Sequence, residues 1–310
     1  MIYALDPIRD IARGMMTARF DRWLPWIYAL PMIAFVGLTF AYPTLSLLTY
    51  SVEHVGRSAY LPTTFVGFAN FSYIATDSLF HRAIANNLRL FLCVPVLLVL
   101  SVILAQLLHD RPRGWKIYRS LLFIPYILSI PVVGVVFGYL FQYQGQLNNG
   151  LRALGLDALA ADWLGSPALA MPTIMFVIIW KELGFGIILC LARLSSVGEQ
   201  YYEAARVDGA SWFQVLRYVT VPQLIPTLAF YAIVELINML SWVFSYIYVM
   251  TLGGPQNSTV VAEFYIYQQV FQNSQIGVGA AAGVVLLCIV GLLLAVRQWL
   301  TGRLAIYESE

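Results

Sequence analysis

The chain has 310 residues, of which 60% are hydrophobic and only 11% charged, and its mean hydropathy is +0.75. Soluble domains contain roughly 45–50% apolar and about 25% charged residues. The composition therefore excludes a water-soluble fold and indicates a chain that lies in lipid. A formal net charge of +2 offers no basic surface for nucleic acid, and an aromatic content of 15% argues against disorder.

Six stretches are long and apolar enough to cross a membrane as helices, which takes roughly 20 residues each. They lie at about 24–49, 88–108, 121–141, 169–191, 224–250 and 276–296. None of them alternates apolar and polar residues as a β-barrel strand does. Prolines are expected to kink several of them, namely Pro31, Pro43, Pro95, Pro125, Pro131, Pro172 and Pro226. The sequence predicts an all-α polytopic protein with a six-helix transmembrane domain over 24–297.

Basic residues predict the orientation, because cytoplasmic loops carry an excess of lysine and arginine. Thirteen of the 18 basic residues fall in one set of connections together with both termini, four fall in the opposite set, and Lys181 lies inside a span. We therefore expect the N-terminal segment 1–23 and the tail 298–310 to be cytoplasmic. The first apolar stretch is too long for a signal peptide and lacks a clean cleavage site, so we expect it to be retained as a span.

The connection 193–223 is the largest internal loop on the predicted cytoplasmic side. Ser195 or Ser196 is expected to cap a helix that begins near Val197, and Glu199 has the spacing of a capping box from Ser196. Gly209 is expected to end this helix, because glycine tolerates the left-handed conformation. A second, amphipathic helix should follow and close at Pro222. A compact helix pair that stands off the membrane suits insertion into a groove of another protein.

Within this connection, the pattern EAA-x3-G-x9-hydrophobic-x-hydrophobic-P resembles the EAA loop of bacterial ABC-type import permeases. The matching residues are Glu203, Ala204, Ala205, Gly209, Val219, Val221 and Pro222. The two valines stand where the family more often has isoleucine and leucine. The resemblance implies the type I ABC importer permease fold, with a loop that docks into a cleft of a separate ATPase subunit. It assigns this coupling to Glu203, Ala204, Ala205, Asp208, Gly209 and Pro222.

Other motifs resemble one branch of that family, the maltose- and glycerol-phosphate-type permeases of carbohydrate importers. They include Tyr118-Arg119, Phe65-x-Gly67-Phe68-x-Asn70-Phe71 and Leu252-Gly253-Gly254-Pro255, the last of which resembles the first-type permease subunit. The branch implies a second permease, two ATPase subunits that use ATP and Mg²⁺, an extracytoplasmic binding protein and a place in the bacterial inner membrane. Whether the solute is a sugar, a sugar derivative or glycerol phosphate stays open.

Polar side chains inside a span usually face a cavity or another helix, because lipid penalises them. In the predicted fifth span, Glu235, Asn238, Trp242 and Tyr246 are separated by three, four and four residues. That spacing places them on one face of a continuous helix. A carboxylate, an amide and two aromatic rings suit the hydroxyls and C–H faces of a sugar. The same stripe would equally suit packing against a partner permease, and both interpretations remain open.

Lys181 and Glu182 interrupt the apolar run of the predicted fourth span. Because adjacent residues on a helix do not face each other, we expect each of them to have its own partner. Lys181 is a further candidate substrate contact, for an anionic solute, or it pairs with Glu235. A structural ion pair is the favoured interpretation.

The chain has no GxxxxGK[ST] phosphate loop, no HExxH or GxSxG motif and no CxxC spacing among its three cysteines. We therefore expect no catalytic residue, no metal and no cofactor in this subunit. A stand-alone secondary transporter or channel is the main alternative, but such carriers commonly contain inverted repeats and none is recognisable. An integral-membrane enzyme would need an ionisable cluster, for which only Lys181, Glu182 and Glu235 are candidates. The stand-alone transporter or channel also leaves the loop from Glu203 to Pro222 unexplained.

Overall fold

The computed structural model describes residue 26, residues 28–56 and residues 62–307. Within these residues, five helical segments are long and apolar enough to cross a membrane: Tyr28–Ser51, Ser78–His109, Ala170–Leu194, Trp212–Asn238 and Ile276–Val296. A sixth crossing consists of two helices whose axes are bent by 98°. The predicted all-α class is confirmed, and the six predicted crossings correspond to these five segments and the bent pair. The predicted segment 1–23 lies outside the described residues.

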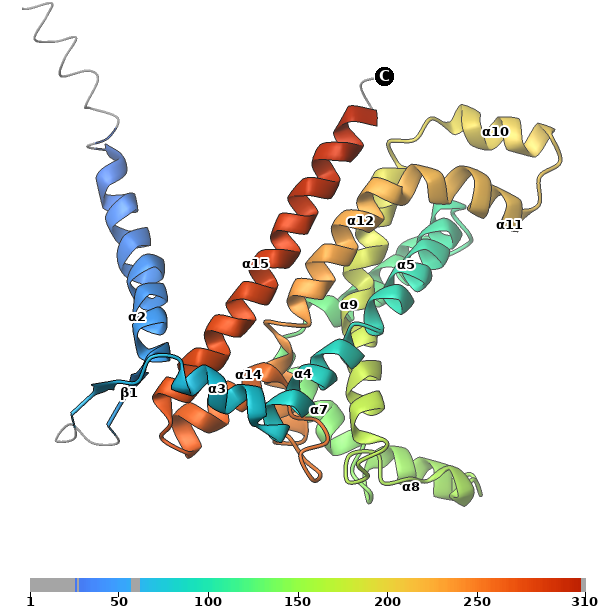
Figure 1. The fold of residues 1–310 in the computed structure, drawn as a ribbon. Helices are drawn as coiled ribbons and strands as arrows, with labels where there is room; N and C mark the ends of the chain where they lie inside the picture. Colours follow the sequence, from blue (N-terminus) through green and yellow to red (C-terminus); the bar gives the residue numbers. More distant parts are fainter. Residues whose placement is uncertain (1–25, 27, 57–61, 308–310) are drawn as a thin grey trace, which may run out of the picture.

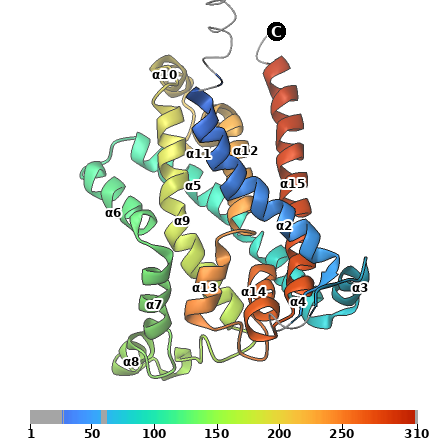
Figure 2. The same ribbon diagram turned by 90° about the vertical axis from the view of Figure 1, so that its left-hand side faces the viewer.

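Each crossing is assembled from the helices labelled in Figures 1 and 2. The first contains the π-helical segment η1 (Gly37–Ala41) and α2 (Tyr42–Ser51), and the second contains α4 (Ser78–Leu90) and α5 (Cys93–His109). The bent crossing is α6 (Trp115–Ile127) with α7 (Ile130–Leu140), and the next is α9 (Ala170–Leu194). The following one joins α11 (Trp212–Val215), the π-helical segment η3 (Leu216–Thr220) and α12 (Val221–Asn238). The last is α15 (Ile276–Tyr307), which extends into the predicted tail 298–310.

The expected proline kinks are confirmed in the third crossing. Leu128 and Ser129 have extended backbones between α6 and α7. Pro131 follows in the first turn of α7, where its missing N–H group is tolerated but its ring blocks continuation of the preceding helix. The bend of 98° therefore has a local cause that the sequence contains.

The second crossing begins about ten residues earlier than the sequence predicts. Part of the expected outer loop forms α3 (Ala69–Thr76) and α4, and the side chain of Asp77 caps α4 by accepting a hydrogen bond from the Leu79 amide at 2.8 Å. The polar residues of α4 hold other outer segments, since Asn86 donates hydrogen bonds to the carbonyls of Ser258 and Val260. Tertiary partners thus satisfy amides that would be costly in lipid.

The remaining elements are short. They are the antiparallel pair β1 (Glu53–His54) and β2 (Thr64–Phe65), α8 (Gln146–Ala153), the 3₁₀ turn η2 (Asp157–Leu159), α10 (Glu199–Val207), α13 (Val243–Met250), α14 (Ala262–Tyr267) and the π-helical segment η4 (Gln268–Gln272). In the strand pair, Glu53 lies opposite Phe65 and His54 opposite Thr64. Figure 1 shows α3 and α8 at one end of the molecule, and α10 with the end of α15 at the other.

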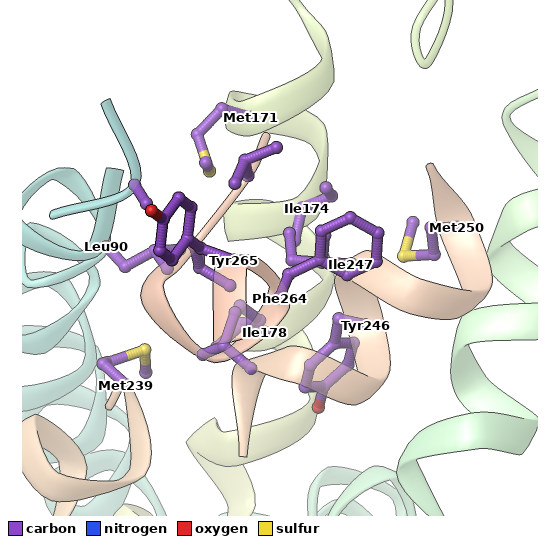
Figure 3. Packing of buried hydrophobic residues seen from close by; sticks show 14 of the residues in the cluster. Leu90, Met171, Ile174, Ile178, Met239, Tyr246, Ile247, Met250, Phe264 and Tyr265 are labelled. Carbon is purple, nitrogen blue, oxygen red and sulfur yellow. The ribbon is translucent and has the colours of Figure 1, made fainter. Parts of the chain in front are cut away.

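The main hydrophobic core lies among α4, α7, α9, α13 and α14. Figure 3 shows Tyr246, Phe264 and Tyr265 packed with aliphatic and methionine side chains there. A second, smaller cluster joins α5, α9 and α12 near the end that carries α10, and it contains Leu194 and Leu224. In contrast, α2 packs against α15 and leaves most of its apolar side chains exposed, which suits a helix surrounded by lipid or a partner subunit.

Candidate functional site

The connection predicted to dock an ATPase forms a hairpin of α10 and α11 that stands off the end of the bundle (Figure 1). Gly209 lies in the turn between them with a φ of +73°, so the predicted left-handed glycine is confirmed. The Asp208 amide donates to the Ala204 carbonyl and the Ala210 amide to the Ala205 carbonyl, each at 2.9 Å. These bonds close the end of α10 as glycine-terminated helices usually close.

The predicted cap of the first helix is wrong. Gly198 occupies the cap position of α10 and provides no side-chain hydrogen bond. The hydroxyl of Ser196 instead donates to the Arg193 carbonyl at 2.7 Å, which helps to close the preceding span α9. A capping box does occur at the start of α11, between Ser211 and Gln214. That spacing is visible in the sequence, but sequence reasoning missed it.

Pro222 does not close the second helix, so this prediction is also wrong. The helix that starts at Trp212 runs without interruption to Asn238, and Pro222 lies at the start of α12. The five residues before α12 form η3, a π-helical segment. A proline removes one backbone hydrogen bond and displaces the carbonyl four residues earlier, and a local π-helical turn accommodates that change.

The hairpin presents an unpartnered surface to the surroundings. Glu203, Ala204 and Asp208 are exposed, and apolar side chains lie beside them, with Val207 87% and Phe213 64% exposed. An exposed mixture of small, apolar and acidic side chains is typical of a protein interface. Five of the six predicted coupling residues are exposed, and Ala205 is half-buried. The exposed ones are Glu203, Ala204, Asp208, Gly209 and Pro222.

The opposite side of the hairpin is held to α5 by polar contacts. Thr220 donates a hydrogen bond of 2.5 Å to Gln106 Oε1, and Gln106 donates one of 2.9 Å to Asp110. The second oxygen of Asp110 accepts a bond of 3.0 Å from the Trp212 indole. The Tyr202 hydroxyl lies 3.5 Å from that of Thr220, and burial raises the pKa of the Tyr202 phenol, so the group stays neutral. A cavity of about 490 Å³ separates the hairpin from the end of α5.

The predicted polar stripe of the fifth span is not on one helical face. α12 ends at Asn238, and α13 begins only at Val243. The break contains neither proline nor glycine. It is held from α4, because the side chain of Asn87 donates a 3.0 Å hydrogen bond to the Met239 carbonyl. A contact from a distant part of the chain therefore interrupts a stretch whose local sequence favours a continuous helix.

The break separates the candidate substrate residues into two groups. Trp242 is 61% exposed and Asn238 is half-buried, so both remain accessible at the break. Glu235 in α12 and Tyr246 in α13 are buried. Within the described residues, neither carboxylate oxygen of Glu235 has a hydrogen-bond partner, and the Tyr246 hydroxyl has none either.

Lys181 and Glu182 are both buried and pair with each other, with 3.1 Å between Nζ and Oε1. The favoured ion pair is present, but the prediction that these neighbours have separate partners is wrong, and Glu235 is not the partner. The long lysine side chain can fold over the helix surface, which the rule about adjacent residues neglects. Lys181 also donates to the Tyr126 carbonyl at 3.4 Å and lies 5.2 Å from the centre of the Tyr126 ring.

α12 places two further buried polar side chains, Tyr231 and Glu235, near the ion pair of α9. The Tyr231 hydroxyl donates a 3.2 Å hydrogen bond to the Glu182 carbonyl, and Glu235 follows Tyr231 one helical turn later on the same face. No cluster of three histidine, cysteine or acidic side chains suitable for a metal occurs in the described part of the chain. The arrangement offers binding groups within a packed helix bundle.

Known proteins resemble the chain over most of its length. The family model described as "Binding-protein-dependent transport system inner membrane component" matches residues 78–305. The sulfoquinovosyl glycerol transport system permease protein SmoG of Agrobacterium fabrum is 33% identical over 270 residues, with 86% of each chain covered. The lactose transport system permease protein LacF of Rhizobium radiobacter is 31% identical over 251 residues, which cover 80% of this chain and 83% of LacF.

A solved structure shares the fold. It is the crystal structure of a bacterial alginate ABC transporter in complex with an alginate pentasaccharide-bound periplasmic protein, and one of its chains superimposes with a TM-score of 0.78. The two sequences are 26% identical, and the match covers 93% of this chain and 97% of the other. The type I importer permease fold is thereby confirmed. The chain belongs to the family of binding-protein-dependent transport system inner membrane components, the permease subunits of ABC transporters.

Proposed function

We propose that this chain is one of two different permease subunits of an importer that carries a sugar or a sugar derivative into the cytoplasm. The exposed hairpin of α10 and α11 carries this proposal, because it is a ready-made docking element at one end of an otherwise membrane-embedded bundle. The carbohydrate class is supported by relatives whose names refer to lactose and sulfoquinovosyl glycerol and by the alginate transporter.

The partners follow from the same reasoning. Two ATPase subunits would bind the hairpins of the two permeases and would use ATP and Mg²⁺, while an extracytoplasmic binding protein would deliver the solute. Both termini of this chain would be cytoplasmic, together with the hairpin. This subunit would carry out no catalysis and hold no metal or cofactor. Its contribution would be half of the translocation pathway and the mechanical connection to ATP hydrolysis.

The substrate contacts we propose are Asn238 and Trp242, because both side chains are accessible at the break between α12 and α13. An amide can hydrogen-bond sugar hydroxyls, and an indole ring can stack on the C–H face of a pyranose. Lys181, Glu235 and Tyr246 would act from behind this surface, since each is buried within the subunit. The break would thus form part of the substrate pathway, because accessible side chains lie where the helix is interrupted.

Reconstitution tests the proposal. The chain is purified with its second permease, ATPase and binding protein and placed in liposomes, and the sugar is chosen from a panel that includes lactose by its stabilisation of the binding protein. We expect uptake only with ATP and the loaded binding protein. The Glu203→Lys variant should insert normally but lose both the ATPase subunit and uptake. Uptake by this chain alone, without ATP, would instead support a stand-alone transporter.

A further inference from the structure

The two covalent connections between the docking hairpin and the membrane bundle both depart from regular α-helix. Residues 195–198, between α9 and α10, are not helical. On the other side, α11 joins α12 through the π-helical segment η3, directly before Pro222. The π-helical turn has wider hydrogen bonds than an α-helix, with the Val221 amide donating to the Leu216 carbonyl, and Pro222 has no N–H group to donate. Because Trp212–Asn238 is one continuous helix, the hairpin stays joined to α12, and a hold from another helix decides which further part of the bundle moves with the hairpin.

Side chains of α5 provide that hold. Gln106 and Asp110 lie one turn apart at the end of this helix and are hydrogen-bonded to each other. Gln106 binds Thr220, at the end of η3, and Asp110 binds Trp212, the first residue of α11. The two contacts thus lie at either end of the α11–η3 segment. Gln106 and Thr220 are buried, at 1% and 0% exposure, so water does not compete for their bond.

We propose that Gln106 and Asp110 form a clamp that makes the hairpin and α5 move as one body, so that motion of a docked ATPase enters the membrane bundle through α5. The proposal rests on the proposed function. It assigns these residues as positioning residues that act on transport through the hairpin, and neither belongs to the EAA pattern. Figure 1 shows the α11 side of the hairpin next to α5.

The placement of α5 makes it a suitable receiver of this motion. α5 packs along α9 and also contacts α12, the two helices that contain the buried groups Lys181, Glu182 and Glu235. The cavity of about 490 Å³ lies between α10 and the end of α5. Across that cavity, the ring of Tyr202 lies 5.0 Å from His109 in the last turn of α5. Leu216 of η3 adds apolar contact, since it shares a buried cluster with Val102 and Ala105 of α5, and the hydrogen bonds fix both ends of the segment against that helix.

The proposal predicts uncoupling without dissociation. Thr220→Val keeps the side-chain shape and removes the bond to Gln106, while Thr220→Ser keeps the hydroxyl. Trp212→Phe removes the bond to Asp110. In the reconstituted complex, Thr220→Val and Trp212→Phe should retain the ATPase subunit and hydrolyse ATP. The number of sugar molecules imported per ATP should fall about tenfold, as expected for the loss of one buried or charge-assisted hydrogen bond. Thr220→Ser should stay near the wild type.

Two comparisons make the result decisive. Arg206→Gln is the matched control, because Arg206 borders the same cavity but pairs only with the exposed Glu199 among the described contacts; its import per ATP should not change. The double variant Thr220→Val/Trp212→Phe should lose less than the sum of the two single effects, because each substitution alone already opens the same clamp. Unchanged import per ATP in both single variants overturns the clamp, and so does loss of the ATPase subunit. Absence of coupled uptake in the wild type would instead refute the proposed function.

Discussion

The docking hairpin and the α12–α13 break are built in opposite ways. The hairpin is exposed, and its turn is determined by local residues, above all by Gly209 with its φ of +73°. The break lies inside the bundle, contains no helix-breaking residue, and is fixed by Asn87 of α4 through the Met239 carbonyl. A surface that must meet another protein keeps a readable local pattern, whereas a feature inside a packed bundle depends on residues far away in the sequence.

The largest expected effect is that of Gly209→Pro in the hairpin. Proline fixes φ near −65° and lacks an N–H group, so it can adopt neither the observed φ of +73° nor the 3.1 Å hydrogen bond from the Gly209 amide to the Arg206 carbonyl. We expect normal membrane insertion with complete loss of ATPase binding and uptake, measured by co-purification and by sugar transport.

The control for this prediction is Gly209→Ala. No atom lies within 4 Å of an added Cβ, so only the left-handed conformation is penalised, by about 1–2 kcal/mol. Partial retention of the ATPase subunit is expected. If Gly209→Pro still co-purifies with the ATPase, the hairpin turn is not required for docking.

The second largest effect is expected at the buried ion pair of Lys181 and Glu182. Variants of this pair distinguish a role in packing from a role in substrate binding. Lys181→Met leaves the Glu182 carboxylate buried without its ion-pair partner, a change that typically destabilises a protein by about 3–5 kcal/mol. The double variant Lys181→Met/Glu182→Gln removes both charges and should regain most of the lost stability and uptake. The measurements are the melting temperature of the purified complex and the rate of sugar uptake.

The double variant decides between the two roles of Lys181. If stability returns but uptake stays absent, transport needs a charge of this pair, and the pair does more than hold the bundle together. If both return, Lys181 and Glu182 only neutralise each other. A single variant cannot make this distinction, because it loses fold and function together.

The sequence alone predicted the structure correctly wherever nearby residues determined it. Apolar length predicted the six crossings, Pro131 predicted the bend of the third, and Gly209 predicted the hairpin turn. Each of these features follows from the residues at the position itself. Ser211 and Gln214 also formed a readable capping box, which was overlooked because Ser196 and Glu199 offered the same spacing closer to the expected start of the hairpin.

The sequence was insufficient where a tertiary contact overruled the local pattern. The predicted stripe at Glu235, Asn238, Trp242 and Tyr246 requires a continuous helix. In the structure α12 stops at Asn238, where Asn87 holds the Met239 carbonyl, and the local sequence gives no sign of this contact. The pairing of Lys181 with Glu182 is similar, because burial of both groups favours the nearest opposite charge despite poor helical geometry. The clamp residues Gln106 and Asp110 carry no motif and become visible only when α5 and α11 are placed together.

A smaller effect is expected at the exposed side of the break. Trp242→Ala removes a ring that is 61% exposed, so the stability of the subunit should hardly change. Loss of one aromatic contact to the sugar, worth about 0.5–1.5 kcal/mol, should raise the sugar concentration at half-maximal uptake up to about tenfold. Trp242→Phe should preserve most of the affinity. If the two permeases separate in the alanine variant, this indole packs against the partner and does not bind the solute.

The smallest expected effect returns to the hairpin. Glu199 and Arg206 form an ion pair of 3.3 Å with side chains that are 69% and 64% exposed. Exposed pairs contribute at most about 1 kcal/mol because water and salt screen them. Glu199→Gln should therefore leave the melting temperature, ATPase co-purification and uptake unchanged. A marked loss of co-purification, stronger at low than at high salt, would mean that Glu199 contacts a basic group of the ATPase, and the docking surface would then extend from the EAA residues back to the first turn of α10.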